Sequence, residues 1–232
     1  MTAHQLSQEL AEVADAETAA QLGRYFKTGP GEYGEGDVFI GVRVPAVRRV
    51  ARRFRDLDEA EIDALLDSAV HEHRFAALQI LVERYAAEPE RVVGQYLGAM
   101  QRGRVNNWDL VDSSAEYILG PWLFDRDRSL VFALAQSDDV WERRIAIITT
   151  FGFIRRGDAT TTLELAELLL GDRHDLIHKA VGWMLREVGK RVDPALLTRY
   201  LDDNAARMPR TALSYAVERL SPERRTHYRS LR

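Results

Sequence analysis

The sequence predicts an all-α protein built as an α-solenoid, in which two-helix repeats stack one upon another. Apolar residues recur at intervals of three and four positions through most of the 232 residues, as in AEIDALLDSAV and LELAELLLG, and turn signals separate these runs. A second observation is that one such pattern returns at a nearly constant interval. Only residues 37–44, DVFIGVRV, look extended, immediately before Pro45.

The repeat consists of five helical segments that superpose with a charged residue in one column. The segments are 71–85, 106–119, 140–153, 176–189 and 207–220. The column residues, at spacings of 35, 35, 35 and 31, are Arg74, Asp109, Arg144, Lys179 and Arg210. Between the segments lie the other helices of each pair, at 88–100, 126–136, 161–171 and 194–204. Such a stack buries each pair against its neighbours and presents a concave surface to a long partner.

Length and composition predict a single domain, residues 1–232, with a sizeable core. The absence of cysteine excludes disulfides and thiolate zinc sites. His174 and His178 have a metal-compatible spacing, but no third ligand is evident, so we expect neither a metal nor a cofactor. Without a secretory pattern, or an apolar run of the ~20 residues that cross a bilayer, we expect a soluble, cytoplasmic monomer.

Basic residues are clustered although the net charge is −4. Arg48 and Arg52 share one helical face within RVPAVRRVARRFR, and a second group contains Arg143, Arg155 and Arg156. These clusters are interpreted either as a phosphate-binding surface or as solvated faces of a chain that prefers arginine to lysine. The net charge alone does not indicate a nucleic-acid partner.

Trp108 and Asp112 stand one helical turn apart in VNNWDLVD. If Asn107 is the N-cap, the helix dipole accounts for Asp109 but not for Asp112, which is the fifth helical residue. The equivalent positions of the other repeats are small or apolar: Ala77, Ile147, Gly182 and Leu213. An inward-facing carboxylate requires partners or a function, so Asp112 is either a site acid or half of a buried ion pair with Arg144.

Trp108, Asp112, Arg144 and Trp183 together offer two π faces, one anion and one guanidinium. This combination suits a substrate that is cationic at one point and anionic around it, as alkylated DNA is. A purine methylated on a ring nitrogen is cationic, and its glycosidic bond breaks with development of an oxocarbenium ion on the sugar. A nearby carboxylate stabilises that ion.

The segments RYFK, FIGVRVPAVRR, NNWDLVDSSAEYILG, WERRIAI, KAVGWMLRE and PRTALSYAVE cover most of the chain. In these segments the sequence resembles the AlkD-type DNA alkylation-repair glycosylases of the HEAT-like repeat superfamily. The resemblance implies a right-handed solenoid of HEAT-like repeats that binds double-stranded DNA. It also implies excision of cationic bases such as 3-methyladenine and 7-methylguanine, without a cofactor and without flipping the lesion into a pocket.

The resemblance also assigns roles to residues. Trp108, Asp112 and Trp183 match the family's lesion-site residues, Arg144 matches its essential arginine, and Tyr25 matches a DNA-contacting tyrosine. Further DNA-binding residues are expected from the arginine clusters, the repeat column and the KAVGWMLRE segment: Arg48, Arg52, Arg143, Arg155, Arg156, Lys179 and Arg186.

The chain departs from the family pattern in a small glycine-rich insertion near residues 28–44, which begins TGPGEYGEGD. Its glycines predict a mobile or hairpin excursion outside the repeat stack. Its acids, Glu32, Glu35 and Asp37, would repel phosphates if they faced DNA. Two alternatives therefore stay open: a non-catalytic HEAT-like protein that binds branched or damaged DNA, and a peptide-binding solenoid, which the net charge of −4 favours.

Overall fold

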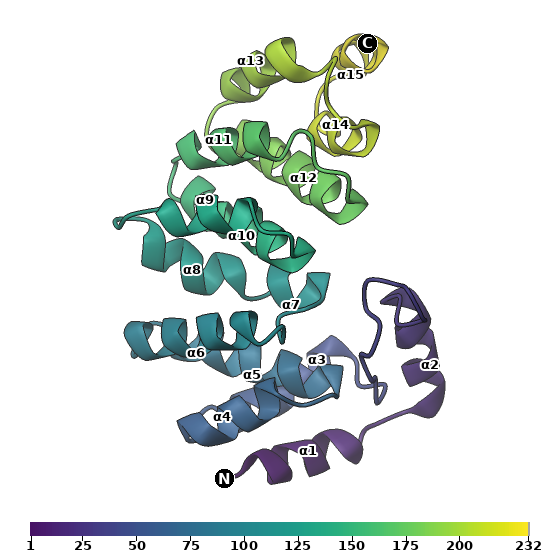
Figure 1. Cartoon of the computed structure of the whole chain (residues 1–232), viewed down its shortest axis with the longest axis vertical. Helices are drawn as coiled ribbons and strands as arrows, with labels where there is room; N and C mark the ends of the chain where they lie inside the picture. Colours follow the sequence, from purple (N-terminus) through teal and green to yellow (C-terminus); the bar gives the residue numbers. More distant parts are fainter. Residues whose placement is uncertain (232) are drawn as a thin grey trace. The chain divides into compact units, whose positions relative to one another are not determined.

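The computed structural model describes residues 1–231, and within them the all-α prediction is confirmed. This range contains fifteen helices and no strand (Figure 1). No helix in the described range is long and apolar enough to cross a membrane. The chain divides into two compact units, unit 1 at Met1–Ser114 and unit 2 at Ala115–Arg232. That the whole chain is one domain stays a prediction.

Unit 1 is built around one central helix, α5. Its helices are α1 Ala3–Ala11, α2 Ala16–Tyr25, α3 Val44–Arg53, α4 Glu59–Leu66, α5 His71–Arg84, α6 Pro89–Gln101 and α7 Trp108–Asp112. Helix α5 contacts α3, α4, α6 and α7. Its apolar residues, including Phe75, Leu78 and Leu81, are almost fully buried. Burial of this apolar surface is the main term that stabilises the unit.

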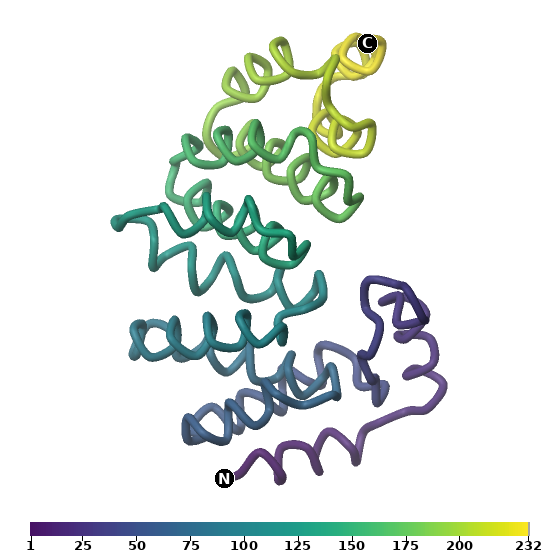
Figure 2. Tube along the Cα trace, viewed as in Figure 1, coloured from purple at the N-terminus to yellow at the C-terminus, as the bar shows by residue number. Residues whose placement is uncertain are grey.

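Unit 2 continues the pairwise arrangement. Its helices are α8 Ala115–Leu123, α9 Ser129–Ala135, α10 Val140–Ile154, α11 Thr160–Leu168, α12 Asp175–Arg191, α13 Pro194–Asn204, α14 Arg210–Ala216 and α15 Pro222–Ser230. Helix α10 contacts α8, α9, α11 and α12, and α12 in turn contacts α13 and α14. The trace in Figure 2 reverses direction between α11 and α12 and again between α12 and α13.

Glycines allow two of these helix contacts to be close. A Cβ added at Gly152 of α10 would lie 2.7 Å from the Cα of Gly120 in α8. A Cβ added at Gly182 of α12 would lie 2.3 Å from the carbonyl oxygen of Ala212 in α14. Larger side chains at these positions would therefore force neighbouring backbones apart.

The predicted repeat agrees with the observed helices. Segments 71–85, 140–153, 176–189 and 207–220 overlap α5, α10, α12 and α14, and the intervening segments overlap α6, α9, α11 and α13. Segment 106–119 differs, because it is divided into α7 and α8 at Ser113 and Ser114. The Ser114 hydroxyl donates to the carbonyl of Leu110, an interaction that bends or interrupts helices.

The chain between α2 and α3 is a series of turns. Gly34 lies against the end of α2, where a Cβ would come within 2.4 Å of the Phe26 carbonyl oxygen. Residues 37–43 are non-helical, as expected, and Val38 forms a single parallel bridge with Val70. The Val38 carbonyl accepts a hydrogen bond of 2.8 Å from the first amide of α5, that of His71. Residues 28–37 form successive turns with bonds of their own, such as that from the Gly34 amide to the Lys27 carbonyl at 2.9 Å, and no strand pair of a hairpin is described there. That this segment is mobile stays a prediction.

Candidate functional site

Helix α7 carries the tryptophan and both aspartates of VNNWDLVD. Asn107 is its N-cap, as predicted, and its side-chain oxygen accepts a hydrogen bond of 2.9 Å from the amide of Trp108. Asp109 is the second helical residue, and its carboxylate accepts a bond of 2.8 Å from the amide of Leu110. The helix dipole stabilises a negative charge at this end.

Asp112 is the last residue of α7 and is half-buried. The residues at the equivalent positions of the other repeats are all buried: Ala77, Ile147, Gly182 and Leu213. The inward-facing environment predicted for Asp112 is therefore only partly realised, because the residue as a whole is not fully buried. Asp112 belongs to unit 1 and Arg144 to unit 2, so an experiment must decide between a site acid and an ion pair with Arg144.

Aromatic rings gather around Trp108. The Phe26 ring stacks on the Trp108 ring with centroids 5.0 Å apart and planes at 20°, and the Phe39 ring stacks on Phe26 at 5.0 Å and 15°. Tyr25, at the end of α2, meets the edge of the Trp108 ring at 5.9 Å and is 64% exposed. The structure thus brings together Tyr25 and Trp108, two residues singled out from the sequence, and adds Phe26 and Phe39, which sequence analysis missed.

A buried polar network, here called the Asp37 cluster, lies beside these rings. It comprises Asp37, His71, Arg74, Asn106, Asn107 and Asp109. Asp37 is central: one carboxylate oxygen accepts from Arg74, and the other lies 2.9 Å from Nδ1 of His71 and 3.3 Å from Nδ2 of Asn107. Nε2 of His71 lies 2.9 Å from the Asp109 carboxylate. The cluster therefore joins the loop, α5 and the start of α7.

The charges within the Asp37 cluster balance. Burial opposes ionisation of Asp37, but the hydrogen bond from His71 and the charges of Arg74 and His71 outweigh it, so the pKa of Asp37 lies below its ordinary value. Burial also disfavours the charged imidazole, yet the charge of Asp109 and hydrogen bonds to both aspartates raise the pKa of His71 to about 9. At neutral pH two cations thus face two acids.

The acids of the insertion are used within the protein. Asp37 is buried, Glu32 accepts a 2.9 Å bond from the amide of Gly29, and Glu35 accepts one of 2.9 Å from the amide of Gly31. The prediction that residues 28–37 lie outside the repeat stack is therefore wrong for the end of the segment. Asp37 is part of the core of unit 1 because a buried histidine and a buried arginine require a counter-charge.

A second carboxylate fixes the chain just after Asp37. Glu72 is buried, and its carboxylate accepts hydrogen bonds from three successive amides, those of Ile40, Gly41 and Val42, at 2.8–3.2 Å. Amide donors arranged in this way form an anion-binding concavity. Glu72 therefore fastens the segment that leads into α3.

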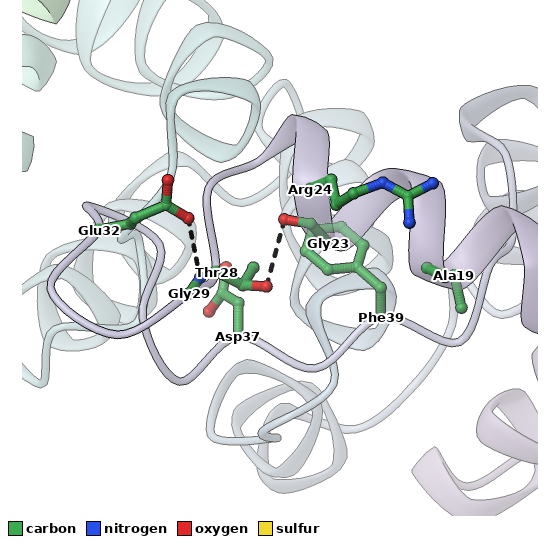
Figure 3. A pocket seen from close by; sticks show the side chains of 9 residues that line it. Ala19, Gly23, Arg24, Thr28, Gly29, Glu32, Asp37 and Phe39 are labelled. Atoms are coloured by element: carbon green, nitrogen blue, oxygen red, sulfur yellow. Dashed lines mark hydrogen bonds between the residues drawn. The ribbon is translucent and has the colours of Figure 1, made fainter.

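An open pocket of about 480 Å³ lies beside the loop (Figure 3). It is lined by Ala19, Ala20, Gly23, Arg24, Thr28, Gly29, Glu32, Asp37 and Phe39. In Figure 3 the Glu32 carboxylate turns toward the Gly29 amide and the Thr28 hydroxyl toward the Gly23 carbonyl. These polar groups already have partners within the chain.

In unit 1 the predicted DNA-binding arginines lie on α3. Arg48 and Arg52 are exposed, and each points toward α5: Nε of Arg48 donates to Gln79 at 3.1 Å and Nε of Arg52 to Glu83 at 3.3 Å. Exposed pairs of this kind contribute little to stability, so both guanidinium groups are free to exchange partners for phosphate.

In unit 2, Arg144 and Trp183 occupy successive repeats, on α10 and α12. Arg144 is buried, and its guanidinium donates to the carbonyl of Leu176. Trp183 is half-buried, and its ring meets the Phe151 ring at 5.7 Å and 63°. The Arg155 guanidinium lies over the same Phe151 ring, 4.7 Å from its centroid.

The remaining basic residues predicted to bind DNA also lie in unit 2, and they differ in accessibility. Arg155 and Arg156 are exposed at the end of α10, whereas Lys179 is half-buried and pairs with Asp175 at 2.7 Å. Arg143 and Arg186 have side chains only 18% and 17% exposed and are held by acids within the unit. Arg155 also pairs with an acid, Glu116, at 3.0 Å, but its side chain is 45% exposed, so exposure favours Arg155 and Arg156 as phosphate contacts over Arg143 and Arg186.

A family model and a solved structure are similar to this chain. A sequence model of the family described as DNA alkylation repair enzyme matches residues 6–220. A solved structure described as a predicted DNA alkylation repair enzyme from Enterococcus faecalis is similar with a TM-score of 0.71 and 20% sequence identity, over 90% of this chain and 97% of that chain. At this identity the likeness supports the fold alone. No curated protein matches the chain in sequence.

Proposed function

Because the chain belongs to the DNA alkylation repair enzyme family, we propose that it is a DNA glycosylase, which hydrolyses the N-glycosidic bond of cationic alkylpurines in double-stranded DNA. Membership makes DNA alkylation repair its general role and DNA its partner. The substrates we propose are 3-methyladenine and 7-methylguanine. No cofactor enters the proposal.

The observation that carries this proposal is the pairing of Tyr25 and Trp108 beside Asp112. An exposed tyrosine ring and a half-buried indole, 5.9 Å apart, offer π surface to a cation. Asp112 stands one helical turn after Trp108 on the same short helix and is half-buried. A cation-attracting surface with a nearby carboxylate suits a base that carries positive charge and a sugar that becomes cationic.

In the proposed reaction, the glycosidic C–N bond breaks and its electron pair moves to the purine, which leaves as a neutral base. The sugar becomes an oxocarbenium ion, and water adds to it and loses a proton, which leaves a hydroxyl on the sugar. The Asp112 carboxylate stabilises the sugar cation electrostatically and orients the water. The purine needs no protonation because alkylation has already made it cationic.

Other residues are assigned to DNA binding in this proposal. Arg48 and Arg52 of unit 1 and Arg155 and Arg156 of unit 2 contact phosphates, as exposed guanidinium groups commonly do. Trp183 and Arg144 are proposed as further site residues on the basis of the resemblance. The melting temperature of each variant at these two positions should be measured as well, because Arg144 is buried and Trp183 is half-buried.

The experiment that tests the proposal is incubation of the purified protein with methylated duplex DNA, followed by mass spectrometry of the released bases. Asp112→Asn keeps the side-chain shape and removes its charge, so excision should fall by on the order of 100-fold or more. Its affinity for DNA should hold or rise. The matched control is Asp56→Asn, which replaces an exposed acid of unit 1.

The outcomes separate the alternatives. A lowered melting temperature in Asp112→Asn, with activity in proportion to the folded protein, would identify Asp112 as a structural ion-pair partner. Wild-type protein that binds duplex or branched DNA but releases no methylated base would support the non-catalytic DNA binder. Failure to bind any DNA, with binding to peptides, would support the peptide-binding solenoid.

A further inference from the structure

The geometry of the Asp37 cluster fixes the protonation of His71. Both imidazole nitrogens lie 2.9 Å from a carboxylate oxygen, Nδ1 from Asp37 and Nε2 from Asp109. An ionised carboxylate only accepts hydrogen bonds, so both nitrogens must carry a proton. The imidazole is therefore a cation that bridges two acids of different segments.

The same cluster holds the beginning of α7 at two points. Asp109 is the second residue of that helix, and Asn107, its N-cap, donates to Asp37 at 3.3 Å. Ring contacts make a third connection: the His71 ring stacks on Phe39 at 4.4 Å, and Phe39 stacks through Phe26 onto Trp108. The orientation of α7 thus depends on the loop that carries Asp37, which lies 70 residues before Asn107 in the sequence.

We propose that Asp37, His71 and Asp109 form a relay in which the protonated imidazole positions α7, and with it the Trp108 ring and Asp112. His71 is a positioning residue in this proposal: it acts through Asp109 and touches no substrate. Its effect on excision rests on the proposed function, whereas its effect on α7 does not.

The surroundings of His71 determine what happens when it loses a proton. Asp37 faces it from the loop and Asp109 from α7, the Phe26 and Phe39 rings cover it, and the neighbouring cation, Arg74, faces Asp37. A neutral imidazole donates only once, so one nitrogen lone pair would then oppose a carboxylate oxygen.

When that repulsion appears, the carboxylate of Asp109 moves away from His71, and that of Asp37 stays in place. The Asp37 side chain is 2% exposed and is also held by Arg74 and Asn107. The Asp109 side chain is 12% exposed, and among residues 1–231 its one further hydrogen-bond partner is the amide of Leu110. Displacement of Asp109 shifts the first turn of α7 and the Trp108 ring beside it.

Nuclear magnetic resonance of the full-length protein tests the relay independently of catalysis. The Trp108 indole N–H, assigned by loss of its signal in Trp108→Phe, and the His71 ring protons are followed between pH 6 and 10. We expect both to titrate together with a midpoint near pH 9. In Asp37→Asn the common midpoint moves toward 6.5, the ordinary histidine value.

The matched control is His73→Gln. His73 lies two residues along α5, but its ring bonds to Ser68 and not to the Asp37 cluster, so the Trp108 titration should be unchanged. The relay is overturned if Trp108 stays constant while His71 titrates, or if His71 titrates at its ordinary pH. Both overturning results are read in the wild-type protein, so failure of Asp37→Asn or His73→Gln to fold leaves the test intact.

Steady-state excision kinetics between pH 7 and 9.5 add a catalytic readout. The relay predicts a lower kcat with little change in KM for His71→Gln, and a wild-type rate that declines with the Trp108 titration. Full kcat in a folded His71→Gln would refute the positioning role. If the wild type releases no base at any pH, the proposed function fails and the resonance titration alone decides the relay.

Discussion

Replacing Asp37 by asparagine tests whether the insertion belongs to the core of unit 1. The change keeps the size and shape of the side chain and removes its charge. The side chains of Asp37 and Arg74 are both only 2% exposed, so water cannot replace the lost interaction. His71 loses one of its two acidic partners at the same time.

The expected loss of stability follows from these contacts. Removing one partner of a buried ion pair costs about 3–5 kcal/mol, because the remaining charge stays buried. The asparagine oxygen still accepts one hydrogen bond, which places the expected value near the lower limit, about 3 kcal/mol. A domain has only about 5–15 kcal/mol of total stability, so the loss is large.

Urea unfolding at pH 7, followed by circular dichroism and tryptophan fluorescence, measures this loss. The matched control is Glu35→Gln, which removes an exposed acid of the same loop that bonds only to the amide of Gly31. It should change the free energy of unfolding by less than about 0.5 kcal/mol. An Asp37→Asn protein as stable as Glu35→Gln would refute the inference that this loop is part of the core.

Gly152→Ala should destabilise unit 2 by about 1–3 kcal/mol in urea unfolding, because its Cβ would lie 2.7 Å from the Cα of Gly120; an unchanged midpoint would contradict the close contact. Protonation of His71 adds to the free energy of unfolding because folding raises its pKa. This contribution is fully present below about pH 6.5 and is lost as the pH rises through about 9. On the order of 3 kcal/mol should disappear over that range, and a His71→Gln protein with the same pH slope would disprove the assignment. Reversing Arg48 and Arg52 to glutamate should weaken binding to all DNA sequences alike and reduce the salt slope of log K by about 0.9 per lost phosphate contact; an unaltered slope excludes this surface.

The helix pairs were predictable because their information is local and periodic. In each repeat the buried apolar residues recur every three or four positions. The charged column from Arg74 to Arg210 recurs near the start of one helix of each pair. The cap of α7 was predictable for the same reason, since Asn107 and Trp108 are adjacent. The DNA alkylation repair family followed from motifs that cover most of the chain.

The Asp37 cluster could not be predicted in this way, because its central acid lies in a loop outside the repeats: the period relates Arg74 to Asp109 but relates neither of them to Asp37. Glycine composition indicates turns in residues 28–37, but it does not indicate where a turn docks. One signal was present: His71, Glu72 and Arg74 begin a helix whose next eight residues, FAALQILV, are apolar except for one glutamine. Buried charges at such a place require counter-charges, and the acids of the insertion were available to supply them.

Helix α7 has only five residues, and its length has a consequence for folding. Isolated helices shorter than about 12–15 residues are marginal in water, so α7 cannot form ahead of the residues that hold it. Those residues lie 38 and 70 positions away along the chain, in α5 and in the loop. Contacts over such separations form late, after the entropy of loop closure has been overcome. We therefore expect the segment that carries Trp108 and Asp112 to acquire its shape after the long helices of unit 1, and to lose it on a local opening of the loop that leaves those helices folded.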